Sequence, residues 1–219
     1  RDSASHELRT PLAVVRSGLE SVEKCSNEEE RNHFLHLMSE ETVHMKRLID
    51  DMLLLANSDA DTLTIKPEAC QPDLLLLDTY EKFETLAKKN GRHLILTLPE
   101  EILPDCFCDI HRTEQIFSII VDNALCYTPS GGKVTLSCHA ENEMLCFLFE
   151  DTGCGISEEK KSHIFERFYR ADDAHTDREH FGLGLCIAKE LTEKQNGNIQ
   201  VVDAPISGSC FMVQLPCAL

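Results

Sequence analysis

Apolar side chains recur at alternating steps of three and four through the first 58 residues, which is the spacing of helices that pack in a bundle. A break falls near residues 25–27, where Asn27 precedes three glutamates and is typical of a helix start. The positions expected to be buried are Leu8, Leu12, Val15, Leu19 and Val22, then Phe34, Met38, Met45, Leu48, Met52 and Leu55. Because two such helices leave one apolar face open, the pattern predicts a dimeric four-helix bundle.

Beyond residue 60 the pattern changes to short apolar runs that alternate with helical stretches. Strands are predicted at 63–65, 94–98, 133–139, 145–150, 199–202 and 209–215, and helices at 72–90, 112–126 and 183–195. Hairpins mixed with helices favour one sheet covered by helices, so the chain combines a two-helix hairpin with an α/β sandwich. The polar stretch 57–61 predicts a boundary between domains at 1–58 and 62–219.

Charge and hydropathy narrow the range of partners. Lys and Arg number 21 and Asp and Glu number 38, which gives a net charge of −17. This charge disfavours nucleic acid as a partner, because phosphate backbones attract basic surfaces. No apolar run of about 18 residues occurs, so we expect this stretch to be soluble. The chain opens inside a predicted helix at Arg1, and we expect any membrane attachment to come from an upstream segment.

The 11 cysteines are scattered and odd in number, which suits a reducing compartment. The closest spacing is Cys106-Phe107-Cys108, and no second pair stands at the spacing of a zinc finger. We therefore expect buried thiols that pack as small hydrophobic groups, and no metal site among the cysteines.

The first helix carries candidate chemistry between Ser5 and Leu12. If Leu8 and Leu12 belong to the buried stripe, then His6, Glu7 and Thr10 occupy outward positions. A neutral imidazole nitrogen can attack phosphorus, and a neighbouring carboxylate fixes its tautomer and takes up the positive charge that develops. Taken alone, the pattern also fits an ordinary exposed histidine in a charged helix.

Two glycine motifs in the second half indicate a nucleotide site. In Asp151-Thr152-Gly153-Cys154-Gly155-Ile156, the glycines permit close approach of a ligand, and the aspartate can accept a hydrogen bond from an exocyclic amine such as that of adenine. Gly182-Leu183-Gly184-Leu185 opens a helix whose N-terminus favours anions. Asn123 offers an amide oxygen to a hard cation. The polar stretch 171–180 predicts a lid, with aromatic residues from Phe165 to Tyr169 at its base.

The order of these motifs resembles the sensor histidine kinases of two-component signalling. Residues 5–12 resemble the H box, and Asp122-Asn123-Ala124 with Tyr127-Thr128-Pro129 resembles the N box. Residues 151–156 resemble the G1 box, 165–170 the F box and 182–185 the G2 box. The resemblance covers nearly the whole chain, and five motifs in one order are more specific than any one of them.

The resemblance implies a dimerisation and phosphotransfer bundle, then an ATP-binding sandwich of the kind shared with gyrase, the Hsp90 chaperones and the MutL repair proteins. It implies His6 as the phosphoacceptor, Glu7 as its acid/base partner and Thr10 as the residue used to dephosphorylate the partner protein. The implied contacts to ATP are Asn123, which also binds Mg²⁺, Tyr127, Asp151, Gly153, Gly155, Ile156, Phe168, Gly182, Leu183, Gly184 and Leu185. The implied partners are a second copy, through residues 1–58, and the receiver domain of a response regulator, at the cytoplasmic side of a bacterial membrane.

Several positions depart from the family pattern. Ile119 stands where many N boxes have an Asn, and Cys126 stands where many have a Lys or Arg. Glu179-His180-Phe181 stands where the family often has a further glycine. The candidates to replace the missing positive charge are Arg167, Arg170, Lys160 and Lys161. Two alternatives stay open: a degenerate or phosphatase-biased module with weak ATP binding, and a plain ATPase of the gyrase, Hsp90 or MutL type.

Overall fold

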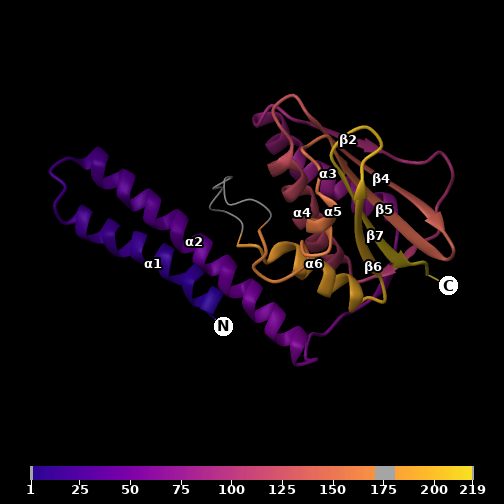
Figure 1. Ribbon diagram of the computed structural model, residues 1–219, viewed down its shortest axis with the longest axis horizontal. Helices are drawn as coiled ribbons and strands as arrows, with labels where there is room; N and C mark the ends of the chain where they lie inside the picture. Colours follow the sequence, from indigo (N-terminus) through magenta and orange to yellow (C-terminus); the bar gives the residue numbers. More distant parts are fainter. Residues whose placement is uncertain (1, 171–180, 219) are drawn as a thin grey trace. The chain divides into compact units, whose positions relative to one another are not determined.

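The computed structural model describes residues 2–170 and 181–218, and in the first helix it describes side chains from residue 7 onward. The chain divides into two compact units. The first joins Arg1–Leu63 with Arg167–Gly184, and the second joins Thr64–Glu166 with Leu185–Leu219. Figure 1 shows two long helices in the first unit and a sheet with helices in the second. The expected domain bounds, 1–58 and 62–219, stay a prediction.

The first unit is a hairpin of two helices, α1 (Asp2–Val22) and α2 (Glu28–Asp59) (Figure 1). The predicted helix start is confirmed, because the Asn27 side chain accepts a hydrogen bond from the backbone N–H of Glu30 at 2.7 Å. Gly18 permits close packing of the two helices, since a Cβ there would lie 2.6 Å from Cγ of Met38. The apolar side chains that become buried on α2 are Met38, Leu48 and Leu55.

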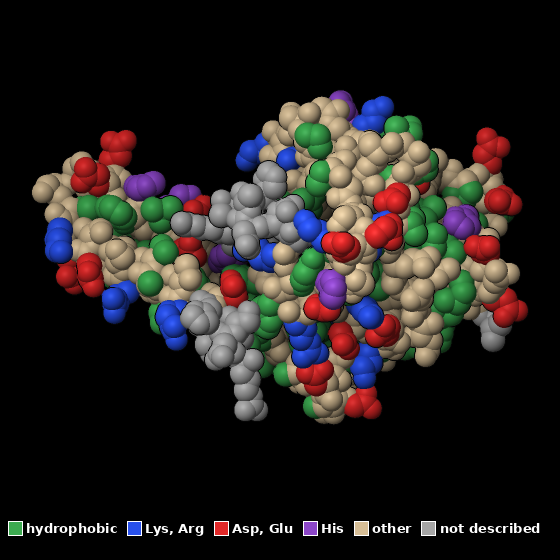
Figure 2. All heavy atoms as spheres, in the orientation of Figure 1, with side chains coloured by type: hydrophobic (Ala, Val, Ile, Leu, Met, Phe, Trp, Pro, Cys, Tyr) green, Lys and Arg blue, Asp and Glu red, His purple; other side chains and the backbone are tan. Residues whose placement is uncertain are grey.

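The predicted apolar stripe is only partly buried in one chain. Leu8, Val15 and Val22 are half-buried, whereas Leu12 and Leu19 are 57% and 54% exposed. Further exposed apolar side chains on α2 are Leu35, Leu37, Val43, Ile49 and Leu53. Figure 2 shows such side chains on the surface of the helical unit. Among the described helices and strands, α1 and α2 pack mainly on each other, so part of the apolar stripe of each stays uncovered.

The main sheet has five strands in the order β2-β4-β5-β7-β6. β2 runs parallel to β4, and the other neighbouring pairs are antiparallel. The strands are β2 (His93–Thr97), β4 (Lys133–Glu141), β5 (Met144–Asp151), β6 (Asn198–Asp203) and β7 (Ser209–Pro216). A separate two-stranded antiparallel sheet pairs β1 (Glu68–Cys70) with β3 (Cys106–Cys108).

The long helices of the second unit lie on one side of the main sheet (Figure 1). These helices are α3 (Pro72–Lys89), α4 (Ile110–Tyr127) and α6 (Gly184–Glu193), and a short helix α5 (Glu158–Lys161) follows β5. Phe117 of α4 anchors the core, with its ring centroid 4.8 Å from that of Phe147 and 5.0 Å from that of Phe149 on β5. One layer of helices on one sheet is the α/β sandwich that the sequence predicts, following the two-helix hairpin.

The strand predicted at 63–65 is wrong. Residues 62–67 have no regular structure, and the strand begins at Glu68. The backbone N–H of Lys66 donates to Oδ2 of Asp109 at 2.9 Å, so a side chain takes the hydrogen bond that a neighbouring strand would supply. The three-residue strand β3 was not predicted, because so short a run has no detectable alternation.

Candidate active site

The residues expected to perform phosphotransfer lie on α1. Residue 6 belongs to the helix, while the side chain of His6 lies outside the described residues. Glu7 is half-buried and Thr10 is exposed, and the neighbouring Pro11 is buried within the helix. Thr10 therefore has the outward position expected of it, one helical turn after His6.

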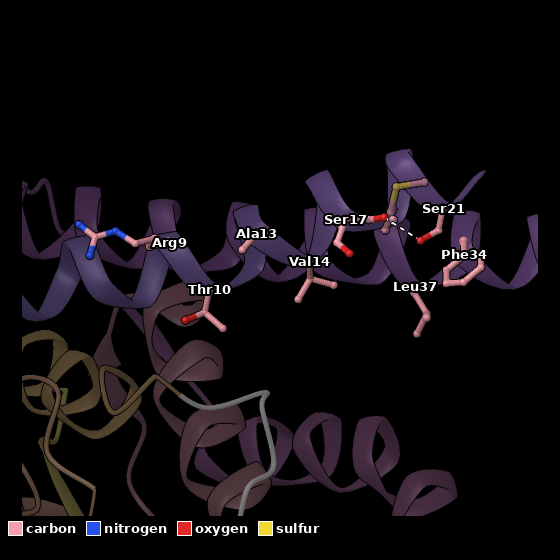
Figure 3. A pocket seen from close by; sticks show the side chains of 10 residues that line it. Arg9, Thr10, Ala13, Val14, Ser17, Ser21, Phe34 and Leu37 are labelled. Atoms are coloured by element: carbon pink, nitrogen blue, oxygen red, sulfur yellow. Dashed lines mark hydrogen bonds between the residues drawn. The ribbon is translucent and has the colours of Figure 1, made fainter. Parts of the chain in front are cut away.

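Thr10 also lies at one end of a groove of about 540 Å³ formed by α1 and α2 (Figure 3). The groove is lined by Arg9, Thr10, Ala13, Val14, Ser17, Gly18, Ser21, Phe34, Leu37 and Met38. Figure 3 shows Thr10, Val14 and Leu37 directed to the same side of the helix pair. An open and largely apolar groove along a helical hairpin is a surface suited to the side chains of another helix.

A buried carboxylate begins the first glycine motif. Asp151 ends β5 and is 5% exposed. Its Oδ1 accepts a hydrogen bond from the backbone N–H of Gly153 at 2.7 Å. Burial raises the pKa of Asp151, while backbone hydrogen bonds from Gly153 and Ser209 act in the opposite direction. A largely buried carboxylate with a perturbed pKa beside a glycine loop is a strong candidate for ligand binding.

Three glycines lie where this loop contacts its neighbours. A Cβ on Gly153 would lie 2.5 Å from the carbonyl oxygen of Tyr127, so this loop closely approaches the end of α4. Gly208 has φ +91°, and a Cβ there would overlap the carbonyl oxygen of Asp151. A Cβ on Gly155, whose φ is +74°, would lie 3.5 Å from the carbonyl oxygen of Gly208. The structure thus brings the predicted residues Tyr127, Asp151, Gly153 and Gly155 together, with Ile156 half-buried just beyond them.

Gly208 was missed by the sequence analysis. The available signal was a glycine that immediately precedes the strand predicted at 209–215. Nothing in the sequence alone indicated that this loop would pack on the end of β5, because that contact joins residues far apart in the chain.

The N box is carried by α4. Asn123 is half-buried on this helix, and Ile119, one turn earlier, is also half-buried. The side chain of Ile119 carries no oxygen, so it cannot supply the amide that the family pattern often has at this position. The side chain of Arg92 donates from Nε to the backbone carbonyl of Thr128 at 2.6 Å, just past the end of α4. Arg92 was missed, although it follows the Asn90-Gly91 pair that ends the predicted helix at 72–90.

Two of the cations proposed as substitutes are engaged with carboxylates. Arg167 donates two hydrogen bonds to Asp59 of α2, at 2.8 and 2.6 Å. Lys161 pairs with Asp203 at 2.8 Å and with Glu158. Lys160 and Arg170 have interaction partners as well. Arg92 is a basic residue that the structure places in contact with the N box.

The second glycine motif meets the F box in the first unit. The backbone N–H of Phe168 donates to the carbonyl of Gly182 at 2.9 Å. Phe168 has φ +62° and Gly182 has φ +70°, and a Cβ on Gly182 would lie 2.7 Å from the carbonyl oxygen of Tyr169. Leu183 is 1% exposed, and Gly184 begins α6, with Leu185 half-buried. The predicted lid at 171–180, including Glu179 and His180, lies outside the described residues.

Phe181 and Arg167, on either side of the predicted lid, contact side chains of α2. Phe181 is 9% exposed and stacks on His44, with 4.2 Å between ring centroids. His44 stands three residues after Glu41, at a point where the apolar stripe of α2 is interrupted. That interruption was the available signal for a contact with something other than α1, and the sequence analysis did not use it.

Two domain families match the chain. Residues 2–61 match the His Kinase A (phospho-acceptor) domain, and residues 108–219 match the histidine kinase-, DNA gyrase B-, and HSP90-like ATPases. The second match covers more than half of the chain. The chain belongs to the histidine kinases. The predicted family is therefore confirmed, and membership of this ATPase family implies that the kinase binds ATP.

Curated relatives agree with this assignment. The kinase is 34% identical to the sensor protein CiaH of Streptococcus pneumoniae over 218 residues, which covers 98% of this chain and 48% of CiaH. It is 32% identical to the sensor protein SrrB of Staphylococcus aureus over 98% of this chain and 37% of SrrB. The kinase chain therefore spans about half, or less, of the length of these relatives.

Solved structures share the fold. The Acinetobacter baumannii histidine kinase AdeS superposes with a TM-score of 0.77 at 22% identity, over 98% of both chains. Full-length ShkA in complex with AMPPNP gives a TM-score of 0.77 at 27% identity, over 98% of this chain and 44% of ShkA. The predicted fold class is confirmed by these matches. None of the described helices has both the length and the apolar character that crossing a bilayer requires.

Proposed function

We propose that the kinase transfers the γ-phosphoryl group of ATP to a ring nitrogen of His6 and then passes it to an aspartate of a response regulator. The observation that supports this most directly is that one chain combines a phosphoacceptor-type helix, which contains His6, with an ATPase-type fold, which contains Asp151. A plain ATPase of the gyrase, Hsp90 or MutL type needs no such helix. This combination therefore favours the kinase over that alternative.

In the proposed first step, a lone pair of the His6 imidazole attacks the γ-phosphorus, and the bond to the β,γ-bridging oxygen breaks to release ADP. Glu7, adjacent on α1, accepts the proton that the imidazole loses. Thr10, exposed one turn further on, orients a water for the reverse hydrolysis of the phosphorylated partner. The reaction depends mainly on positioning and charge neutralisation, so domain movement must bring His6 into line with the nucleotide.

Asp151 is the residue that we assign to adenine. The carboxylate accepts hydrogen bonds from the backbone N–H groups of Gly153 and Ser209, and its two oxygens have further lone pairs with which to accept the exocyclic amine. Gly153 allows the loop to lie close against the end of α4, where a side chain would overlap the carbonyl oxygen of Tyr127. A carboxylate acceptor beside glycines that lack side chains fits a planar base, and Gly155, Ile156 and Tyr127 would complete the contacts.

Asn123 is the residue that we assign to Mg²⁺. Its half-buried amide lies on α4, and an amide oxygen is a suitable ligand for a hard cation. When bound, Mg²⁺ supplies charge neutralisation at the β- and γ-phosphates. Because Ile119 offers no ligand on the same face, we expect waters and phosphate oxygens to fill more of the coordination sphere. Gly182, Leu183, Gly184, Leu185 and Phe168 would line the phosphate side.

The kinase is proposed to act as a homodimer through residues 1–58. Leu12 and Leu19 are more than half exposed on α1, and the apolar groove between α1 and α2 is open. A second hairpin would bury both in a four-helix bundle.

The proposed partner after phosphorylation is a response regulator receiver domain. The histidine kinase ThkA, which shares this fold with a TM-score of 0.77 at 19% identity, has been solved in complex with the response regulator protein TrrA. By analogy, the receiver domain would dock on the exposed face of the hairpin near His6. The net charge of −17 does not favour an acidic partner, so local contacts must dominate.

Replacing His6 tests the phosphoacceptor assignment. With labelled ATP and Mg²⁺, His6→Gln should abolish acid-labile, alkali-stable label on the protein, a loss of at least about 100-fold, because the nucleophile is removed. His36→Gln is the matched control, since His36 is an exposed histidine paired with Glu40 on α2. Label retained at the full level in His6→Gln would refute the assignment.

Replacing Asp151 tests the nucleotide site. Asp151→Asn should weaken ATP binding by about 10- to 100-fold, because a hydrogen bond to a charged group contributes about 1.5–3 kcal/mol. Glu150→Gln is the control, because the neighbouring side chain points to the other face of β5. Binding is measured by calorimetry, and dimerisation should be unchanged. Equal affinity in Asp151→Asn would remove Asp151 from the site.

A phosphatase-biased module is the second candidate, and Ile119 and Cys126 at the N box favour it. It predicts weak ATP binding and slow labelling in the unmodified kinase, together with hydrolysis of phosphorylated partner. Thr10→Ala should then reduce hydrolysis without changing ATP affinity. Fast labelling of His6 at ordinary ATP concentrations would exclude this candidate.

A further inference from the structure

Three cysteines meet on one face of the two-stranded sheet. β1 and β3 pair antiparallel, with Cys70 directly opposite Cys106 and Glu68 opposite Cys108. Side chains two residues apart on a strand point to the same face, so Cys106 and Cys108 share a face. Residues directly opposite each other also share a face, which adds Cys70 to the group.

The three sulfur atoms form a compact set. Sγ of Cys70 lies 3.4 Å from Sγ of Cys108, and all three Sγ atoms lie within 4.8 Å of one another. Cys106 and Cys108 are 0% exposed, whereas Cys70 is half-buried. The cluster is therefore closed on the inner side and reached from solvent on the side of Cys70.

The three cysteines also contact one another through polar atoms. Sγ of Cys70 donates to the backbone carbonyl of Cys106 at 3.6 Å and lies in hydrogen-bond contact with Sγ of Cys108. Cations bind cysteine as the thiolate, so a bound ion would hold the three sulfurs ionised and release their protons to solvent.

We propose that Cys70, Cys106 and Cys108 form a binding site for a thiophilic d¹⁰ cation, Zn²⁺ or Cu⁺. A zinc–sulfur bond of about 2.3 Å in tetrahedral geometry places sulfurs about 3.8 Å apart, which the present cluster reaches by small side-chain rotations. Thiolates are the ligands that select these cations over Mg²⁺. Three protein ligands and one solvent-accessible side give Zn²⁺ an open fourth position, while Cu⁺ is satisfied by three sulfurs.

The proposed site departs from the expectation that the cysteines act only as packing groups. The sequence analysis found Cys106-Phe107-Cys108 without a second pair, and the third ligand comes from a strand 36 residues earlier. The site is independent of the proposed phosphotransfer. Cys108 precedes Asp109, which caps α4 by accepting a hydrogen bond from the backbone N–H of Arg112, so a bound ion would also fix the start of that helix.

Metal titration of the reduced full chain under anaerobic conditions tests the proposal. Zn²⁺ and Cu⁺ are added separately, and bound metal is measured by mass spectrometry together with the ultraviolet charge-transfer absorption of metal thiolates. About one equivalent should bind per chain. Cys70→Ser should lower the affinity at least about 100-fold, because even supporting residues around a metal contribute 10- to 100-fold. Binding of one cation and not the other identifies which of the two the site takes.

The controls distinguish this cluster from other cysteines. Cys138→Ser removes a buried thiol of β4, and His139→Gln removes a residue of a second group formed with Glu141 and Cys146. Both should bind metal as the unmodified chain does. Cys70 is half-buried, so Cys70→Ser keeps the test valid even where Cys108→Ser fails to fold.

Four results would overturn the proposal. These are no stoichiometric binding of either cation, equal affinity in Cys70→Ser, loss of binding in His139→Gln, and isolation of the chain with a Cys70–Cys108 disulfide that forms even under reducing conditions. The last outcome is recognised by a mass lower by two hydrogen atoms.

Discussion

The two units of the kinase differ in how far a single chain completes their cores. In the sheet unit, Phe117, Phe147 and Phe149 are each 0% exposed, and the ring of Phe117 packs on the other two. In the helical unit, Leu12 and Leu19 are more than half exposed although they lie on the predicted apolar stripe. The sheet unit buries its central aromatic side chains within one chain. The helical unit leaves part of its apolar stripe exposed, which a second copy would cover.

Strands and helices bury their apolar side chains in different ways. The apolar side chains of a strand all lie on one face of the sheet, so a single layer of helices from the same chain buries them. A helical stripe about a third of the circumference wide needs contacts on more than one side. An apolar stripe left uncovered by the intramolecular partner therefore indicates association.

Removing a central aromatic side chain should have the largest effect. Phe147→Ala deletes a ring that is 0% exposed and packs on Phe117, and it should destabilise the sheet unit by about 3–5 kcal/mol. The loss should be the same at low and high protein concentration, which chemical denaturation at two concentrations measures. Phe107→Ala, at a ring 44% exposed, is the control and should cost much less. A loss of stability that depends strongly on protein concentration would show that the core of the sheet unit is not complete within one chain.

Removing an exposed apolar side chain from α1 should have an intermediate effect, and it should weaken the dimer without destabilising the sheet unit. Leu19→Ala should weaken the dimer by about 1–2 kcal/mol per chain, since it removes part of the apolar area available for burial. Sedimentation should show a dissociation constant raised by about 10-fold or more. Ile102→Ala, at a side chain 101% exposed in the sheet unit, should leave association unchanged. Equal behaviour of the two variants would contradict the dimer.

A buried acid on α2 should give the smallest effect and a defined pH dependence. Burial raises the pKa of Asp51 from 3.8 to about 6, while Arg47 lowers it and Asp50 raises it further. The folded state therefore holds a proton that the unfolded chain releases, so stability falls as pH rises from about 4 through about 6. Asp51→Asn should remove this slope and stabilise the helical unit at pH 7 by about 1 kcal/mol after screening is discounted.

Denaturation of both forms across this pH range, at one protein concentration, checks the expectation. Asp50→Asn, at the adjacent exposed position, should keep most of the slope, because Asp50 makes the smallest of the three contributions to the pKa of Asp51. A slope that survives in Asp51→Asn, or one that appears in the opposite direction, would show that another group titrates.

Most elements could be predicted from periodicity, because long amphipathic helices and alternating strands carry repeated local signals. The helices at 72–90 and 112–126 and the hairpin at 133–150 were found for this reason. The strand predicted at 63–65 failed because its apolar residues have no strand opposite them, and the hydrogen bond to Asp109 is a tertiary contact. β3 is too short to carry a period.

The candidate site likewise combines residues that a local motif reveals with residues that only tertiary contacts reveal. Asp151 and its glycines could be found from the motif, since the chemistry is contained in six consecutive residues. Arg92, Gly208 and the stacking of Phe181 on His44 could not, because each acts through a neighbour that is distant in the chain. The cysteine cluster belongs with these, as its third thiol comes from another strand.

The strand order has a consequence for biosynthesis. β7, which follows the other described strands in the sequence, occupies an interior place between β5 and β6. Until residue 216 has been translated, the β4–β5 hairpin retains a bare edge and β6 lacks its partner. The nascent sheet therefore stays incomplete until β7 has been made, and a chain cut off before β7 would expose strand edges that can pair with other chains.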